Sequence, residues 1–137
     1  MTTLFLGHLA GDYLLQNEWM AMNKSKNTLN GWIAAMVHCI LYTLAVCLFM
    51  WNFDLIWMVV VFLSHFPIDK FGLAEKYMIL KGSGLRNYIN SANRNKHYTD
   101  NNTGQDMLTG GFRAVVYAVT DNAMHLILMW GAYKLIY

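Results

Sequence analysis

The sequence is poor in charged residues, proline and cysteine. Only 13% of its 137 residues are charged, roughly half the share of about 25% that is typical of soluble domains. With one proline and two cysteines, the composition excludes a disordered chain, a coiled coil, a collagen-like fibre and a disulfide-stapled secreted module. The net charge of +2 is too small to indicate nucleic-acid binding, and the length fits one domain.

Long apolar runs take the place of the missing charges. Residues 31–51 contain no Asp, Glu, Lys or Arg, and a helix of this length crosses the ~30 Å core of a bilayer. The first run has neither the basic segment nor the cleavage site of a signal peptide, so we expect a retained helix. The sequence predicts an all-α integral-membrane bundle, one domain over residues 1–137. Its four transmembrane helices are expected at about 2–20, 31–51, 55–71 and 109–136.

The basic residues indicate an orientation for this bundle. Eight of the ten Lys and Arg residues lie in the connections between the first and second and between the third and fourth predicted helices. The positive-inside rule places these connections in the cytoplasm, and therefore both termini on the periplasmic side of a bacterial inner membrane. The longer connection, 72–108, is expected to begin with an amphipathic segment from Leu73 and to continue as a polar loop.

Ionisable residues inside the apolar runs carry the chemical information. Each Asp in a membrane helix costs about 2.5 to 3.5 kcal/mol on insertion scales, so a partner must offset it. Three His/Asp pairs are spaced four residues apart, which places both side chains on one helix face, although Pro67 interrupts one pair. A further histidine lies in the second run. The predicted metal ligands are His8, Asp12, His38, His65, Asp69, Asp121 and His125.

Imidazole and carboxylate ligands without thiolate suit Zn, Mn, Fe or Ni. Seven ligands exceed the four of one tetrahedral zinc, so two metals are plausible. The overall expectation is one to three divalent ions, zinc above the others. A water activated by the metal would attack phosphorus, with Asp12, Asp69 or Asp121 as general base. Lys70 and Arg113 lie near the basic ends of their helices. They could bind a substrate phosphate or reach lipid headgroups.

Five segments in a specific order carry a resemblance. They are H-L-A-G-D-Y-L-L-Q (8–16), W-x-x-x-x-K (19–24), H-C-x-x-Y (38–42), H-F-P-I-D-K (65–70) and D-N-x-x-H (121–125). Together they resemble an uncharacterised family of small integral-membrane proteins of bacteria and phages, in which Gln stands at the position of Asn122. More distantly, the repeated H-x-x-x-D is similar to zinc-dependent phospholipase C, P1-type nuclease and inner-membrane metal-dependent hydrolases. That resemblance implies a zinc cluster held by the same His and Asp residues, and cleavage of phosphate esters.

The expected function of this membrane-embedded protein is hydrolysis of a phosphate ester, either a lipid headgroup or a nucleotide reached from the cytoplasm. An alternative is a non-enzymatic membrane protein, phage-encoded or not, whose His/Asp cluster conducts protons, carries metal or fixes packing. A di-iron oxidase is disfavoured because such sites use Glu, which the apolar runs lack, and a soluble all-α bundle stays open. Gly7 and Gly11 have the spacing of a helix-association motif, so a homo-oligomer is also open.

Overall fold

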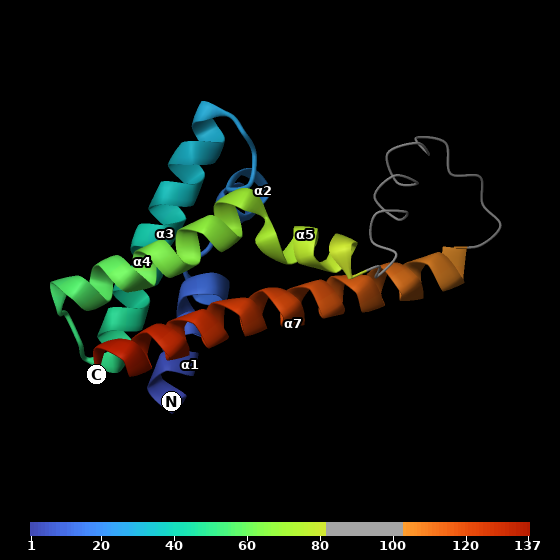
Figure 1. Ribbon diagram of the computed structural model, residues 1–137. Coiled ribbons are helices and arrows are strands. Elements are labelled where there is room, and N and C mark those ends of the chain that lie inside the picture. The colour runs from blue at the N-terminus through green and yellow to red at the C-terminus, as the bar shows by residue number, and fades with distance from the viewer. Residues whose placement is uncertain (82–102) are drawn as a thin grey trace. The chain divides into compact units, whose positions relative to one another are not determined.

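A computed structural model describes residues 1–81 and 103–137, and only the backbone for residues 103–110 and 113. This part of the chain is helical and contains no strand (Figure 1), so the prediction of an all-α fold is confirmed. The elements are α1 (Thr2–Leu9), η1 (Ala10–Leu14), α2 (Glu18–Asn23), α3 (Leu29–Met50), α4 (Leu55–Phe71), α5 (Leu73–Leu80) and α7 (Thr103–Ile136).

The chain forms two compact units. Unit 1 contains Met1–Gly72 and Ala123–Tyr137, and unit 2 contains Leu73–Asn122. In unit 2, α5 occupies the beginning of the predicted amphipathic segment and buries Ala74 and Met78. The predicted polar loop falls mostly on residues 82–102, which lie outside the described residues. The candidate site is built in unit 1.

The helix expected at about 2–20 is divided into three pieces. After α1, the chain widens into one π turn, in which the Leu15 N–H donates to the Ala10 carbonyl at 3.1 Å. The chain then leaves the helical conformation, and the side chain of Asn17 accepts a hydrogen bond from the Met20 N–H at 2.9 Å to begin α2. Turns of π-helix are frequent at functional sites, and this turn carries Asp12.

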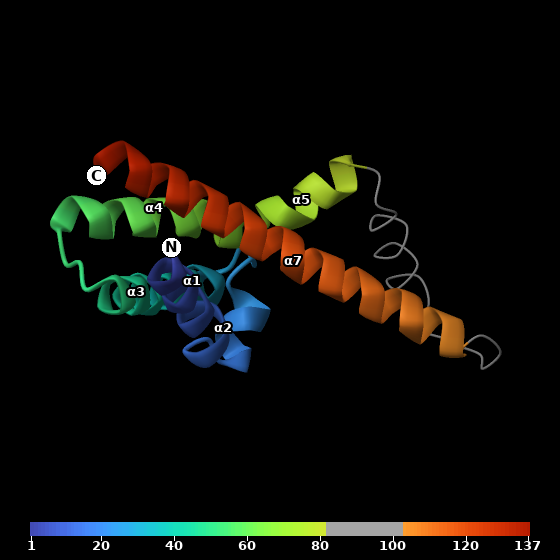
Figure 2. The ribbon, with the colours of Figure 1, turned by 90° about the horizontal axis from the view of Figure 1, so that it is seen from below.

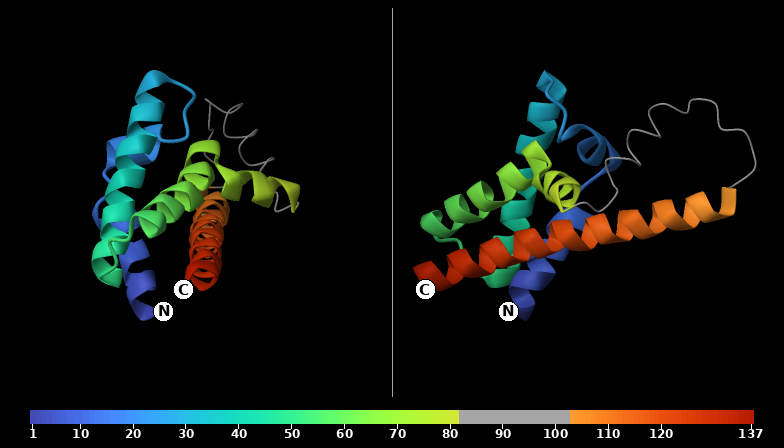
Figure 3. Two further views of the ribbon diagram at one scale, coloured as in Figure 1. Left: turned by 60° about the vertical axis from the view of Figure 1, so that its left-hand side comes forward. Right: turned by 45° about the vertical axis from the view of Figure 1, so that its right-hand side comes forward.

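Helices α3 and α4 form the scaffold of unit 1. The side chains of Thr28 and Asp54 accept backbone N–H groups in the first turns of α3 and α4, which fixes where each helix begins. Helix α4 ends at Gly72, whose φ of 57° is readily adopted by glycine. Pro67 lies inside α4, which continues to Phe71. The two helices join at a short turn and diverge from it (Figure 3).

Helix α1 lies alongside α3 in unit 1 (Figures 1 and 2). The contact is close because Gly7 has no side chain: a Cβ there would come within 2.9 Å of Val46 Cα. The buried apolar cluster beneath it includes Tyr42, Trp57 and Met129. The termini lie at one end of this unit, since Thr3 Oγ1 is 3.2 Å from Met50 Sδ and the rings of Trp57 and Tyr137 are 6.4 Å apart.

Unit 1 exposes many apolar side chains and buries several ionisable ones. Helices α3 and α4 expose large apolar side chains along most of their length, while imidazoles and a carboxylate are buried between helices. Only α3 among the described helices is long and apolar enough by itself to cross a membrane. Helix α4 with α5 counts as a second crossing if the pair is one broken span. Buried core helices of soluble proteins meet the same criterion, so length and composition alone do not show four spans.

Candidate metal centre

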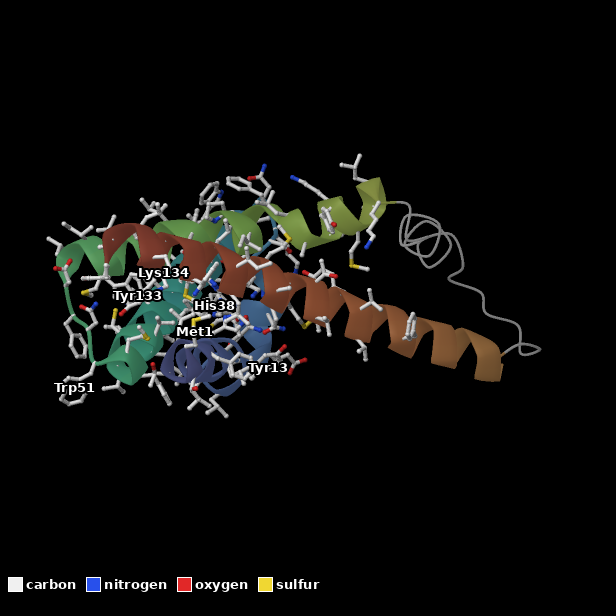
Figure 4. All side chains as sticks on the ribbon, turned by 60° about the horizontal axis from the view of Figure 1, so that its bottom comes forward. Met1, Tyr13, His38, Trp51, Tyr133 and Lys134 are labelled. Atoms are coloured by element: carbon white, nitrogen blue, oxygen red, sulfur yellow. The ribbon has the colours of Figure 1, made fainter. Side chains whose placement is uncertain are left out.

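Four ionisable side chains from three elements of unit 1 converge on one point. Asp12 comes from η1, His38 from α3, and His65 and Asp69 from α4. Figure 4 shows His38 in the interior of the unit. One ligand atom from each residue lies within 4.8 Å of the ligand atoms of the others. The side chains of both histidines and of Asp69 are at most 2% exposed, and that of Asp12 is 12% exposed.

The distances from the two histidine nitrogens to each other and to the carboxylate oxygens match those of a tetrahedral metal site. His38 Nε2 lies 3.0 Å from His65 Nε2, 3.3 Å from Asp12 Oδ1 and 2.9 Å from Asp69 Oδ2. His65 Nε2 lies 3.5 Å from the same Asp12 oxygen and 3.2 Å from the same Asp69 oxygen. Ligands placed about 2.0–2.1 Å from a tetrahedral zinc ion are separated by about 3.3–3.4 Å. The chain therefore holds two nitrogens and two oxygens at ligand spacing for one small dication.

Hydrogen bonding within the cluster leaves acceptors unsatisfied. A neutral imidazole nitrogen either donates or accepts, so one proton between His38 Nε2 and His65 Nε2 cannot also serve the carboxylates. Asp12 Oδ1 lies near both rings yet makes no hydrogen bond of good geometry, and neither do the buried Nδ1 atoms of His38 and His65 within the described part of the chain. A cation at the centre would satisfy Asp12 Oδ1 and both Nε2 atoms at once.

Two further histidines hold the outer oxygens of the carboxylates. His8 Nδ1 lies 3.4 Å from Asp12 Oδ2, and His125 Nε2 lies 3.3 Å from Asp69 Oδ1. Each carboxylate thus has one oxygen in the tetrahedron and the other on an imidazole outside it. Such partners orient metal ligands and are expected to affect metal affinity about 10- to 100-fold.

Tyr42 of α3 connects the two sets of histidines. Its hydroxyl oxygen is 2.8 Å from His8 Nδ1, and its ring stacks on the ring of His65 with centroids 3.5 Å apart. The side chain is fully buried. Gly11 allows this position, because a Cβ there would meet Tyr42 Cδ2 at 2.5 Å. Tyr42 therefore fixes the orientation of the candidate ligand His65 and of His8, which contacts the candidate ligand Asp12.

Two further sequence candidates, Asp121 and Arg113, lie on α7. Asp121 is half-buried, four residues before His125, and belongs to unit 2. Asn122, also in unit 2, donates through Nδ2 to the Ala118 carbonyl at 2.6 Å. Arg113 lies on α7, but its side chain is outside the described residues. Six of the seven predicted ligands are thus gathered in unit 1: four in the tetrahedron and two beside it.

Lys70 contacts backbone carbonyls. Its ammonium donates to the Lys26 carbonyl at 2.7 Å and to the Lys24 carbonyl at 3.4 Å, and lies 4.3 Å from the centre of the Trp32 ring. These contacts fasten the connection between α2 and α3 to the end of α4. The predicted role of Lys70 as a phosphate-binding residue stays a prediction.

Sequence reasoning missed Lys24 as a site residue. Its ammonium lies 2.7 Å from Asp69 Oδ2 and donates to Gln16 Oε1 at 2.7 Å. Helical spacing could not reveal this contact, because Lys24 lies in a connection and Asp69 lies 45 residues further along the chain. A signal was present, since Gln16 and Lys24 end the first two of the five segments that carry the family resemblance.

The fold and site define an all-helical protein with a buried His/Asp cluster able to hold a metal ion. A family model, Protein of unknown function (DUF3307), matches residues 1–137, and the chain belongs to this family. No curated protein and no solved structure matches the chain.

Proposed function

We propose that the protein is a membrane-embedded, metal-dependent hydrolase of phosphate esters, with zinc as the preferred ion. The observation that carries this proposal is the buried set of Asp12, His38, His65 and Asp69, in which the five distances that involve a histidine Nε2 are 2.9–3.5 Å. Two carboxylates and two neutral imidazoles balance the charge of one dication. A zinc ion there would polarise a phosphoryl oxygen and lower the pKa of water to about 7.

The polarity of unit 1 supports a place in the bilayer. Its outward apolar side chains suit lipid contact, and its ionisable side chains face inward, as expected for functional groups within a membrane. We propose four spans in a bacterial inner membrane, in line with the phage and bacterial proteins that the sequence resembles. Lys24, Lys26 and Lys70 gather at the end of α3 away from the termini. This arrangement favours a cytoplasmic lysine end and periplasmic termini.

Asp12 is the ligand best suited to act as general base. Its side chain is the most exposed of the four, and it lies on the π turn, where the helix is interrupted. Release of Asp12 from the coordination position would leave His38, His65 and Asp69 as a three-residue set with one open position, the arrangement of catalytic zinc sites. The freed carboxylate would then lie where it can take a proton from the attacking water.

A second candidate is a metal-holding membrane protein without turnover, in which the cluster carries ions or fixes packing. The observation that favours it is that four protein atoms occupy all four positions of the tetrahedron. Closed sites of this kind are typical of structural zinc. The two candidates differ in a single property, the hydrolysis of substrate.

Measurements of metal content and turnover on the same detergent-purified samples test the proposal. The substrates are a chromogenic phosphodiester, a nucleotide and a short-chain phosphatidic acid. We expect His65→Ala to lose both metal and turnover, and Asp12→Asn to keep most metal while turnover falls about 100-fold or more. Glu18→Gln is the control, because Glu18 is an exposed carboxylate in the first turn of α2. Bound metal without hydrolysis of any substrate would favour the second candidate, and absence of metal from folded protein would refute both.

A further inference from the structure

The ammonium of Lys24 contacts the same Asp69 oxygen that belongs to the candidate metal site. The ammonium lies 2.7 Å from Asp69 Oδ2, and this oxygen is also within 2.9 Å of His38 Nε2 in the tetrahedron. A dication at the centre would lie about 2 Å from the same oxygen. Two cations so close to one another repel strongly. Displacement of the ammonium, or an anion that both cations share, would relieve this repulsion.

The charges of the site favour the shared anion. For the four residues of the tetrahedron alone, the carboxylates of Asp12 and Asp69 neutralise one dication, and the ammonium of Lys24 adds one further positive charge. Within the described part of the chain, the ammonium of Lys24 contacts this cluster through Asp69. An anion bound between the ammonium and the metal would restore neutrality. A site without Lys24 would have no such requirement.

Lys24 also lies on the accessible side of the cluster. The side chain of Lys24 is 17% exposed and that of Asp12 is 12% exposed. The side chains of the other three cluster residues, His38, His65 and Asp69, are at most 2% exposed. Lys24 and Asp12 are therefore more exposed than these three residues. Gln16 Oε1 accepts a hydrogen bond from the ammonium of Lys24, which helps to hold it beside Asp69.

The connection that carries Lys24 is held from two directions. Lys70 binds the carbonyls of Lys24 and Lys26 from α4. On the α3 side, a Cβ on Gly31 would meet the Lys26 carbonyl oxygen at 2.1 Å, so the connection folds closely onto the start of that helix. The backbone of Lys24 is thus fixed, while its side chain spans the distance to Asp69. This arrangement is built to place one ammonium at the edge of the metal site.

We propose that Lys24 is the anion-binding residue of this site and that it recognises the phosphate group of the substrate together with the metal. The inference rests on the proposed metal centre and adds a residue that helical spacing did not reveal. Lys70 is a positioning residue that acts through the backbone of Lys24. The phosphate can belong to a lipid headgroup or to a water-soluble ester, since the recognised chemistry is the same.

The proposal makes metal and phosphate binding reciprocal. If Lys24 and the metal share the anion, inorganic phosphate must raise the affinity for zinc, and zinc must raise the affinity for phosphate by the same factor. We expect a gain of at least about fivefold for the wild type. In Lys24→Met the gain disappears. Without phosphate, this variant binds zinc at least about tenfold more tightly than the wild type, because the competing cation is gone.

The test is a zinc titration of the purified full chain, with free zinc held low by a competing chelator, with and without inorganic phosphate. Lys24→Arg keeps the charge and is expected to keep the coupling. Lys26→Met is the matched control, since this lysine lies two positions further along the same connection and its exposed ammonium donates to Asn23 Oδ1. A second arm uses nanodiscs of phosphatidylcholine with or without phosphatidic acid. A larger gain there than with inorganic phosphate identifies a lipid headgroup, and an equal or smaller gain identifies a water-soluble ester.

Three results would overturn the inference in distinguishable ways. Equal coupling to phosphate in Lys24→Met and in the wild type would show that the metal alone binds the anion, and the metal centre would stand without a role for Lys24. Failure of the wild type and of every variant to bind zinc while folded would remove the metal centre itself, and with it this inference. Zinc binding that is indifferent to phosphate in the wild type would also overturn the role of Lys24.

Discussion

The ion pair between Lys24 and Asp69 is expected to contribute strongly to the stability of the metal-free protein. The ammonium and carboxylate lie 2.7 Å apart, the Asp69 side chain is 2% exposed and the Lys24 side chain is 17% exposed. At this distance two unit charges attract by about 6 kcal/mol at an effective dielectric constant of about 20, before desolvation is subtracted. Removal of one partner from a buried pair costs about 3–5 kcal/mol, because the other charge is left uncompensated.

A double-mutant cycle measures this pair. We expect Lys24→Met and Asp69→Asn each to lower the free energy of unfolding by about 3 kcal/mol or more. Asp69→Asn should be the more costly, because it also weakens contacts to His38 and His65. The double variant should lose at least about 2 kcal/mol less than the sum of the single variants, because no unpaired charge remains. Reversible unfolding in detergent with a chelator present provides the assay. Losses that add to within about 0.5 kcal/mol would refute the ion pair and the reasoning about Lys24 that depends on it.

Three further predictions concern the packing of the site and its binding of metal. Gly11→Ala is expected to lower the unfolding free energy by about 1–3 kcal/mol, because its Cβ would meet Tyr42 Cδ2 at 2.5 Å. Gly131 lies inside α7 with no atom within 4 Å of the new Cβ, so Gly131→Ala should raise the unfolding free energy by about 0.5–1 kcal/mol, and equal effects would contradict the packing. Tyr42→Phe is expected to cost about 1–2 kcal/mol, since it removes the hydroxyl 2.8 Å from His8 Nδ1; an unchanged denaturant midpoint would argue against that hydrogen bond. Removal of metal by a chelator should lower the thermal midpoint by an amount that grows with zinc concentration in the untreated sample, and an identical midpoint in both samples would contradict metal binding to the folded state.

The histidine and carboxylate pairs could be predicted because they depend on helical spacing alone. His65 and Asp69 are one turn apart on α4, and their side chains meet at 3.2 Å despite Pro67 between them. His8 and Asp12 meet at 3.4 Å, although the helix changes from α to π between them. His38 had no partner on its own helix, yet an imidazole in an apolar run needs one, and the neighbouring α4 supplies it.

The sequence could not predict which of these atoms face the metal position and which contact the outer histidines, because this depends on how the helices pack. Spacing does not distinguish a carboxylate oxygen in the tetrahedron from the oxygen that contacts His8 or His125. The break after η1 was also missed, since the apolar run continues through Leu15 and only the capping side chain of Asn17 marks the new helix. Lys24 was missed because its contact with Asp69 joins a connection to a helix far along the chain.

Zinc-edge X-ray absorption of the purified, zinc-loaded protein is the most direct test of the central claim, which is that Asp12, His38, His65 and Asp69 form a tetrahedral metal site. The account predicts about four nitrogen and oxygen neighbours at about 2.0–2.1 Å, with the outer-shell scattering of two imidazole rings and no sulfur. A shell of about six oxygens without imidazole, or protein that is folded yet retains no zinc, would contradict it.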